Sequence, residues 1–136
     1  MSTTALVADR IEIADLFTRF ALLLDERRWD DVGTVFTDDV AVESPRIHVR
    51  GIDKVVDFLQ ESEVDGEQTQ HTNTDLLVEV DGDQAAVSAN SIVYYFREGQ
   101  SPHQTGGLRQ ISTVVRTPAG WRISETRIVP GWVRQV

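Results

Sequence analysis

The chain has 136 residues, 40% of them hydrophobic, which suits one compact domain with its own core. Twenty-two acidic residues against 13 Lys and Arg leave a formal charge of -9. A charge of this sign disfavours nucleic acids and anionic membranes as partners. The absence of cysteine excludes disulfides, thiolate nucleophiles and cysteine metal sites.

Helical patterns dominate the N-terminal half of the chain. Residues 2–4 offer N-cap side chains, and apolar residues at helical spacing then continue to about residue 26. The run Phe20-Ala21-Leu22-Leu23-Leu24 is apolar on every side, so Asp25 is expected at the edge of the protein interior. Trp29, Val32, Val35 and Phe36 suggest a short second helix, closed by the polar turn Thr37-Asp38-Asp39.

Beyond that turn, the pattern changes from helix to strand with one exception. Val40 to Val49 alternates weakly and predicts one or two short strands, interrupted at Pro45. A third helix is expected from Ile52 to about Ser62, because its apolar residues recur at intervals of three and four.

The C-terminal half predicts two β-hairpins. Gln68–Val80 and Gln84–Arg97 are rich in β-branched and aromatic residues and flank the turn Asp81-Gly82-Asp83. After a loop, Gly107–Arg116 and Trp121–Val133 flank a second turn that contains Pro118 and Gly120. Helices followed by an antiparallel meander indicate an α+β fold, with helices on one face of a curved sheet. Most of the aromatic residues are expected in its core, including Trp29, Trp121, Trp132, Phe17, Phe20, Tyr94 and Phe96.

Asp25 and His71 are the candidate catalytic residues. Imidazole has an unperturbed pKa of roughly 6.5, so a histidine serves as a base near neutral pH. A buried carboxylate that accepts from one ring nitrogen fixes the tautomer and stabilises the imidazolium formed during proton transfer. Strict alternation places His71 with Asn73 and Glu79, opposite Leu76 and Val78. His71 therefore faces a pocket only if a β-bulge shifts the phase or the apolar side packs elsewhere, for example in a dimer.

Several motifs resemble one superfamily. They are Leu24-Asp25-Glu26-Arg27-Arg28-Trp29, Phe36-Thr37-Asp38-Asp39, Gly51-Ile52, Gln70-His71-Thr72-Asn73 and Gly120-Trp121-Arg122-Ile123. Together with the order of elements, they resemble the nuclear transport factor 2-like (NTF2-like) superfamily over essentially the whole chain. Within it, the chain is most similar to the SnoaL-like branch, which includes scytalone dehydratase, bile acid dehydratase and hexachlorocyclohexane dehydrochlorinase.

The resemblance implies a cone-like α+β barrel with a deep apolar pocket. It also implies that His71 removes a proton from carbon while Asp25, which follows the first helix, orients the imidazole. Ketosteroid isomerases carry their base where this chain reads Val42-Glu43-Ser44-Pro45, with Glu43 one position out of register, so that chemistry is disfavoured. An Asp-Arg-Asp array of the epoxide-hydrolase kind is not assembled from this sequence.

The remaining predictions concern binding residues and partners. Asn73 and Arg109 are candidates to support a substrate oxygen, and Tyr94 or Tyr95, Phe20 and Trp29 to line the pocket. His48 and His103 are isolated, and the histidines lack HxH or HxxxH spacing, so no metal and no cofactor are expected. The expected partners are a small hydrophobic molecule and further copies of the chain in a homodimer or larger oligomer. No apolar run is long enough for a membrane span and no secretory signal is evident, which favours the cytoplasm.

Three functions remain open on the sequence. The leading one is a cofactor-independent lyase or isomerase acting on a hydrophobic cyclic or polyketide-like molecule. The second is an aldol catalyst of the polyketide-cyclase type that uses the same two residues. The third is a non-catalytic binding or dimerisation module of the same fold.

Overall fold

The computed structural model describes residues 3–136 and shows an α+β fold, in which the helices lie in the first half of the chain and the sheet is mixed and six-stranded. Helix α1 spans Thr3–Glu26, the 3₁₀ helix η1 spans Trp29–Thr34, and α2 spans Ile52–Glu61. The strands are β1 (Phe36–Ser44), β2 (Ile47–Arg50), β3 (Gln68–Asp81), β4 (Gln84–Phe96), β5 (Gln104–Thr117) and β6 (Gly120–Gln135).

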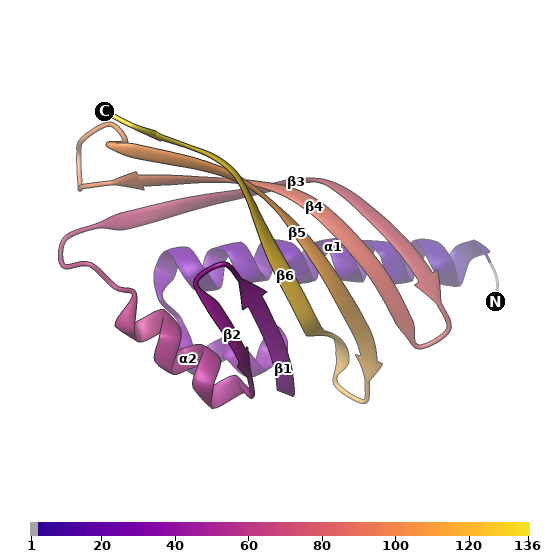
Figure 1. Cartoon of the computed structure of the whole chain (residues 1–136). Coiled ribbons are helices and arrows are strands. Elements are labelled where there is room, and N and C mark those ends of the chain that lie inside the picture. Colours follow the sequence, from indigo (N-terminus) through magenta and orange to yellow (C-terminus); the bar gives the residue numbers. More distant parts are fainter. Residues whose placement is uncertain (1–2) are drawn as a thin grey trace.

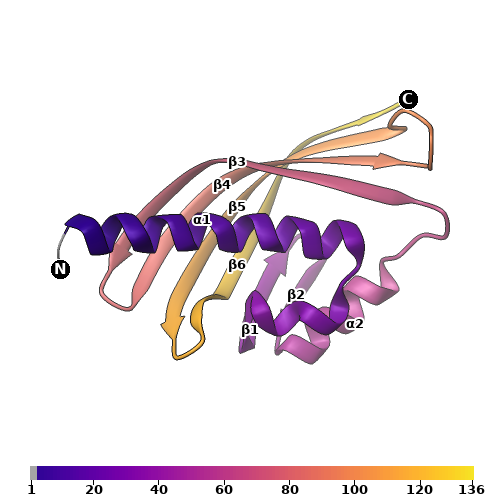
Figure 2. The same cartoon turned by 180° about the vertical axis from the view of Figure 1, so that it is seen from behind.

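The sheet is open rather than closed into the barrel expected from the resemblance. Its order is β2-β1-β6-β5-β4-β3, so β2 and β3 form its two edges. All neighbours are antiparallel except β1 and β6, which pair in parallel. Strands β3 to β6 bend strongly near their middle, and α1 lies across one face of them, which we call the inner face (Figures 1 and 2).

Helix α1 forms because its apolar residues recur at helical spacing and no Pro or Gly interrupts it. The buried stripe of Ile13, Leu16, Phe17 and Phe20 packs into one core with residues of the sheet. Phe20 is 5% exposed and meets Phe36 of β1 edge to face at 5.2 Å between ring centroids. The apolar helix end predicted from the sequence is therefore anchored in the core.

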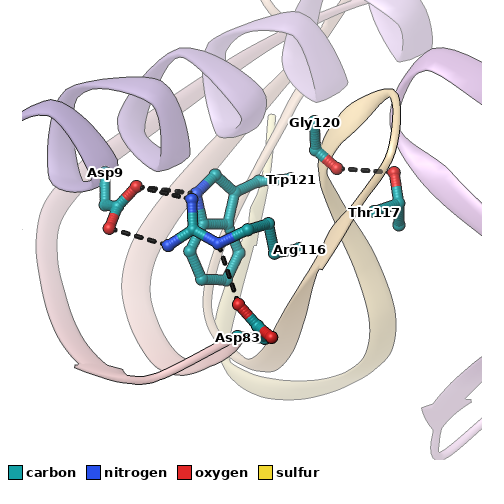
Figure 3. Close-up of polar contacts among 6 residues, drawn as sticks. All are labelled: Asp9, Asp83, Arg116, Thr117, Gly120 and Trp121. Carbon is teal, nitrogen blue, oxygen red and sulfur yellow. Dashed lines mark hydrogen bonds and ion pairs between the residues drawn. The ribbon is translucent and has the colours of Figure 1, made fainter. Parts of the chain in front are cut away.

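A polar cluster joins the first half of α1 to the end of β5 and to the turn between β3 and β4 (Figure 3). The Arg116 guanidinium donates two hydrogen bonds of 2.9 Å to the Asp9 carboxylate and one of 3.1 Å to Asp83. It lies 4.5 Å from the ring centroid of Trp121, whose Nε1 donates to Asp9. Hydrogen bonds from Arg116 hold the pKa of the Asp9 carboxyl below its usual value, against the opposing effect of burial and with help from Trp121.

Two local expectations are corrected by the structure. The stretch Thr37-Asp38-Asp39 lies inside β1 rather than in a turn, because β1 begins at Phe36, which pairs with Ile123 of β6. Trp132 is 51% exposed instead of filling the core. Its ring lies over Gly107, where an added Cβ would come within 2.2 Å of the indole, so the glycine makes this contact possible.

Candidate active site

Asp25 is placed by the end of α1. The Arg28 amide donates to Leu23 O at 2.9 Å and the Arg27 amide donates to Leu24 O at 3.3 Å, which is the Schellman pattern of a helix C-terminus. Arg27 occupies the left-handed position of this motif with φ of +54°, where glycine is the usual residue. Its side chain donates to Glu67 O and pairs with Glu63, and these contacts hold the turn that follows Asp25.

His71 is placed by a β-bulge in β3. The β3–β4 register shifts between Thr74 and Leu77, so that two residues of β3 oppose one of β4, and Asp75 there has φ of +55°. Beyond the bulge, Val78 points to the inner face; before it, His71 and Asn73 do. The bulge thus resolves the conflict in strict alternation, and His71 and the apolar residues of β3 share one face.

The Asp25 carboxylate and His71 are in direct contact. His71 Nδ1 lies 2.6 Å from Asp25 Oδ1, and the His71 backbone amide donates to Oδ2 at 2.9 Å and to Oδ1 at 3.1 Å. The Thr69 hydroxyl donates to Oδ1 at 3.1 Å. Three donors therefore converge on one carboxylate, which fixes its position.

This geometry assigns the two ring nitrogens different roles. An ionised carboxylate only accepts hydrogen bonds, so Nδ1 donates to it, and in the neutral imidazole Nε2 is then the nitrogen with the lone pair. Among residues 3–136, no hydrogen-bond partner contacts Nε2. The side chains of Asp25 and His71 are each 16% exposed, so the pair is largely desolvated without being sealed. An imidazole held in this way is arranged to accept a proton at Nε2.

Of the other candidates, Asn73 shares the inner face with His71, and its amide nitrogen donates to Phe17 O of α1 at 3.1 Å. Phe20 belongs to the core. Trp29 packs against that core, and its Nε1 donates to Glu63 Oε1 at 2.6 Å. Both aromatic residues therefore have structural partners.

Arg109 and Tyr94 point away from His71. His71 pairs with Val93, so the next residue, Tyr94, projects from the opposite, outer face of the sheet. Arg109 is exposed on that same outer face, pairs with Asn90 and donates to its side chain at 3.4 Å. Neither position supports contact with a molecule bound at His71.

The tyrosine on the inner face is Tyr95, which stands directly opposite Thr69. Burial, and then the negative charge of Glu67, raise the pKa of the Tyr95 hydroxyl, with Arg46 opposing them. The phenol is therefore a protonated donor at neutral pH. The sequence offers both tyrosines, and only the phase of β3 relative to β4 distinguishes them.

A second pair of an acid and a histidine lies near this end of the sheet. His103 Nε2 lies 2.8 Å from Glu67 Oε2, and the side chains are 40% and 21% exposed. The His103 amide donates to Tyr95 O at 2.9 Å, and His103 O accepts from the Val136 amide. The backbone and side chain of His103 therefore join the end of the loop before β5 to β4, to Val136 and to Glu67.

Two hollows of the surface lie away from Asp25 and His71. One of about 350 Å³ is lined by Arg19, Leu22, Leu23, Arg28, Asp31 and Thr34, between α1 and η1, and a smaller one lies beside Trp121. Glu43, one position out of register with the ketosteroid isomerase base, is exposed on β1. Among residues 3–136, no three His, Asp or Glu side chains are grouped to hold a metal ion, and no helix is long and apolar enough to cross a membrane.

Comparisons with known proteins agree with this architecture. The chain is 32% identical over 130 residues to the uncharacterized protein Rv2910c of Mycobacterium tuberculosis, covering 90% of this chain and 86% of that protein. Two solved structures superpose with a TM-score of 0.86 each. A scytalone dehydratase-like protein from Novosphingobium aromaticivorans has 16% identity and covers 99% of this chain and 92% of its own. A hexachlorocyclohexane dehydrochlorinase (LinA) has 17% identity, with 99% and 93% covered.

An NTF2-like superfamily protein from Salmonella enterica superposes with a TM-score of 0.81 at 16% identity, covering 93% of this chain and 94% of that one. Identities this low establish a shared fold and leave the activity to the site. The SnoaL-like domain family matches residues 5–127, which is most of the chain. The protein therefore belongs to the SnoaL-like family and has the α+β fold of NTF2-like proteins.

Proposed function

We propose that this protein is a cofactor-independent lyase or isomerase that acts on a hydrophobic cyclic or polyketide-like small molecule. The observation that carries the proposal is the 2.6 Å contact between His71 Nδ1 and Asp25 Oδ1, with Nε2 left free of protein partners among residues 3–136. Two neighbours in fold, the scytalone dehydratase-like protein and the dehydrochlorinase, bear names that describe eliminations.

The proposed reaction begins with proton transfer from carbon to His71 Nε2. The electron pair of the broken C–H bond forms a double bond, and either a substituent on the neighbouring carbon departs with its bonding electrons or an adjacent carbonyl becomes an enolate. Asp25 stays ionised and stabilises the imidazolium charge. The proton on Nε2 is then returned to the departing oxygen, to carbon or to water.

The test is hydrogen exchange at carbon, because elimination, isomerisation and aldol cyclisation all share the first step. The protein is incubated in D₂O with a panel of cyclic ketones that includes 1-tetralone, and deuterium at the carbon next to the carbonyl is followed by NMR. Wild type should accelerate exchange and His71→Ala should not. His48→Ala, an exposed histidine on β2, is the matched control and should behave as wild type.

Equal exchange with wild type and His71→Ala would contradict the proposal. Binding of the ketones without any acceleration would favour the non-catalytic binding module. Exchange that depends on His71, followed by carbon–carbon bond formation with a polyketide substrate, would favour the cyclase.

The outer face of the sheet supports a second proposal, self-association. Leu77, Ile111 and Trp132 are 61%, 39% and 51% exposed there, on strands β3, β5 and β6. Arg109, Arg127 and Glu79 put charges of both signs on the face, which suits an isologous contact with a second copy. Sedimentation should show a dimer for wild type and a monomer for Ile111→Lys. A monomeric wild type would contradict this proposal.

A further inference from the structure

Three buried polar atoms on the inner face have no hydrogen-bond partner among residues 3–136: Asn73 Oδ1, Ser91 Oγ and Gln110 Oε1. Ser91 is 1% exposed and Gln110 is 3% exposed. Leaving such a group unpaired costs free energy, so nearly all buried polar atoms in folded proteins have a partner. Three orphan atoms on one face of one sheet therefore require an explanation.

The three side chains form a continuous row that begins next to His71. Asn73 follows His71 by two residues and points to the same face. Ser91 stands directly opposite Asn73 on β4, and Gln110 of β5 lies diagonally from Ser91, because Ala89 pairs with Gln110 and Ser91 pairs with Leu108. Such neighbours on one face lie within reach of one another's side chains. The orphan atoms thus extend the site across the sheet, away from Asp25.

The adjacent polar residues on the same face show the contrast. Ser112 of β5 and Thr126 of β6 are equally buried, and their hydroxyls are 2.8 Å apart in a hydrogen bond. Polar side chains on this face therefore pair where the geometry allows it. The Asn73 amide nitrogen is also satisfied, by Phe17 O, so only its acceptor atom is left over.

We propose that Asn73, Ser91 and Gln110 form a specificity subsite that binds a hydroxyl group of the substrate. Two of the orphan atoms are carbonyl oxygens, which only accept, and the third is a hydroxyl, which can donate or accept. A bound hydroxyl group can therefore donate its one hydrogen bond to a carbonyl oxygen of the row and accept one from Ser91 Oγ. The three side chains of the row are themselves uncharged. The substrate class is therefore a neutral cyclic molecule that carries a hydroxyl beyond the carbon that loses its proton.

This inference rests on the proposed function only for the position of the reacting carbon at His71, and it can be tested by binding alone. The probes are hydroxy-1-tetralone isomers, each compared with the methyl-1-tetralone of the same substitution, because methyl and hydroxyl groups are similar in size. For at least one isomer, wild type should bind the hydroxyl compound about fivefold or more tightly than its methyl partner. Ser91→Ala should remove this preference, and Ser88→Ala, on the outer face of the same strand, should keep it.

The His71→Ala variant separates the two proposals. It should lose carbon exchange and keep the hydroxyl preference. A wild type that accelerates no exchange but still prefers the hydroxyl compound would reject only the proposed function. Absence of any hydroxyl preference in wild type, or its persistence in Ser91→Ala, overturns the subsite.

A second arm uses stability in the absence of ligand. Because Ser91 Oγ has no partner among residues 3–136, Ser91→Ala should leave the melting temperature unchanged or raise it. Ser112→Ala should lower it by several degrees, since Thr126 loses its partner. A loss in Ser91→Ala as large as that in Ser112→Ala would mean that Ser91 is satisfied in the free protein, by a structural water, and would overturn the subsite.

Discussion

Replacing Asp25 with asparagine tests whether the carboxylate, and not merely a side chain of that shape, makes His71 a base. Asparagine keeps the size of the side chain but offers one acceptor oxygen and an NH₂ donor. The wild-type carboxylate accepts from His71 Nδ1, the His71 amide and Thr69 at once. The backbone amide cannot change its role, so the NH₂ group of the substituted side chain faces either that amide or the imidazole. The second arrangement reverses the tautomer and places the proton on Nε2.

The expected loss follows from the charge that Asp25 contributes. Two unit charges about 4 Å apart interact by roughly 4 kcal/mol at an effective dielectric constant of about 20. Both side chains are 16% exposed, so solvent reduces this value, and about 2 to 4 kcal/mol is the working range. If that energy stabilises the imidazolium in the transition state, Asp25→Asn should slow exchange roughly 30- to 1,000-fold.

The assay is deuterium exchange into the cyclic ketones, combined with ¹⁵N NMR of the imidazole. Thr69→Val is the matched control, because it removes one hydrogen bond to the same carboxylate while the charge stays. It should lose about tenfold or less. The reasoning is refuted if Asp25→Asn exchanges at the wild-type rate while His71→Ala is inactive, or if the neutral imidazole of wild type carries its proton on Nε2.

Three further predictions concern stability. Asp9→Asn should lower the free energy of unfolding by about 1 to 2 kcal/mol at pH 7 in urea titrations, because it weakens the hydrogen bonds from Arg116. The pKa of Asp9 is lowered in the folded state, so the stability that its carboxylate contributes is present above roughly pH 3.9 and is lost as pH falls through the folded pKa. The difference in free energy of unfolding between Asp9→Asn and wild type should therefore disappear below about pH 4. The pKa of Tyr95 is raised in the folded state, so the stability contributed by its protonated hydroxyl is complete below roughly pH 10 and is lost as pH rises through the folded pKa. In thermal melts at alkaline pH, Tyr95→Phe should therefore lose less stability than wild type does. Asp75→Val should destabilise by about 1 to 2 kcal/mol or more and slow exchange, since a β-branched residue resists the positive φ of the bulge, whereas Asp75→Gly should keep both; equal behaviour of the two variants would refute this.

Local patterns in the sequence predict most of the elements. The apolar spacing of α1 and α2 and the Gly-containing turns of both hairpins depend on neighbouring residues, and the structure confirms these elements close to the expected bounds. The parallel pairing of β1 with β6 is long-range, and no local pattern indicates it. That pairing draws Thr37-Asp38-Asp39 into a strand although its composition is typical of a turn. Arg116 and Asp9 are 107 residues apart, so no local pattern indicates their contact either.

The candidate site likewise combines residues that the sequence predicts with residues that only the three-dimensional structure identifies. Asp25 and His71 are predicted from residue type, position and resemblance, and the structure brings them together. Which tyrosine and which polar residues accompany them depends on the phase of β3, and one inserted residue at the bulge reverses that phase. Tyr95 in place of Tyr94, and Ser91 and Gln110 in place of Arg109, follow from this shift.

The bulge also explains how a strand with apolar residues on its inner face can present the imidazole of His71 there. Without it, Val78 on the inner face would send His71 outward, and the core and the site would compete for one face of β3. The left-handed backbone at Asp75 costs energy, and the same holds for Arg27 after α1. Each of these two conformations follows one member of the pair along the chain, Arg27 after Asp25 and Asp75 after His71. Strain at both positions is consistent with a site whose geometry is maintained for its chemistry, and relieving it at Asp75 with glycine should leave exchange intact only if the register persists.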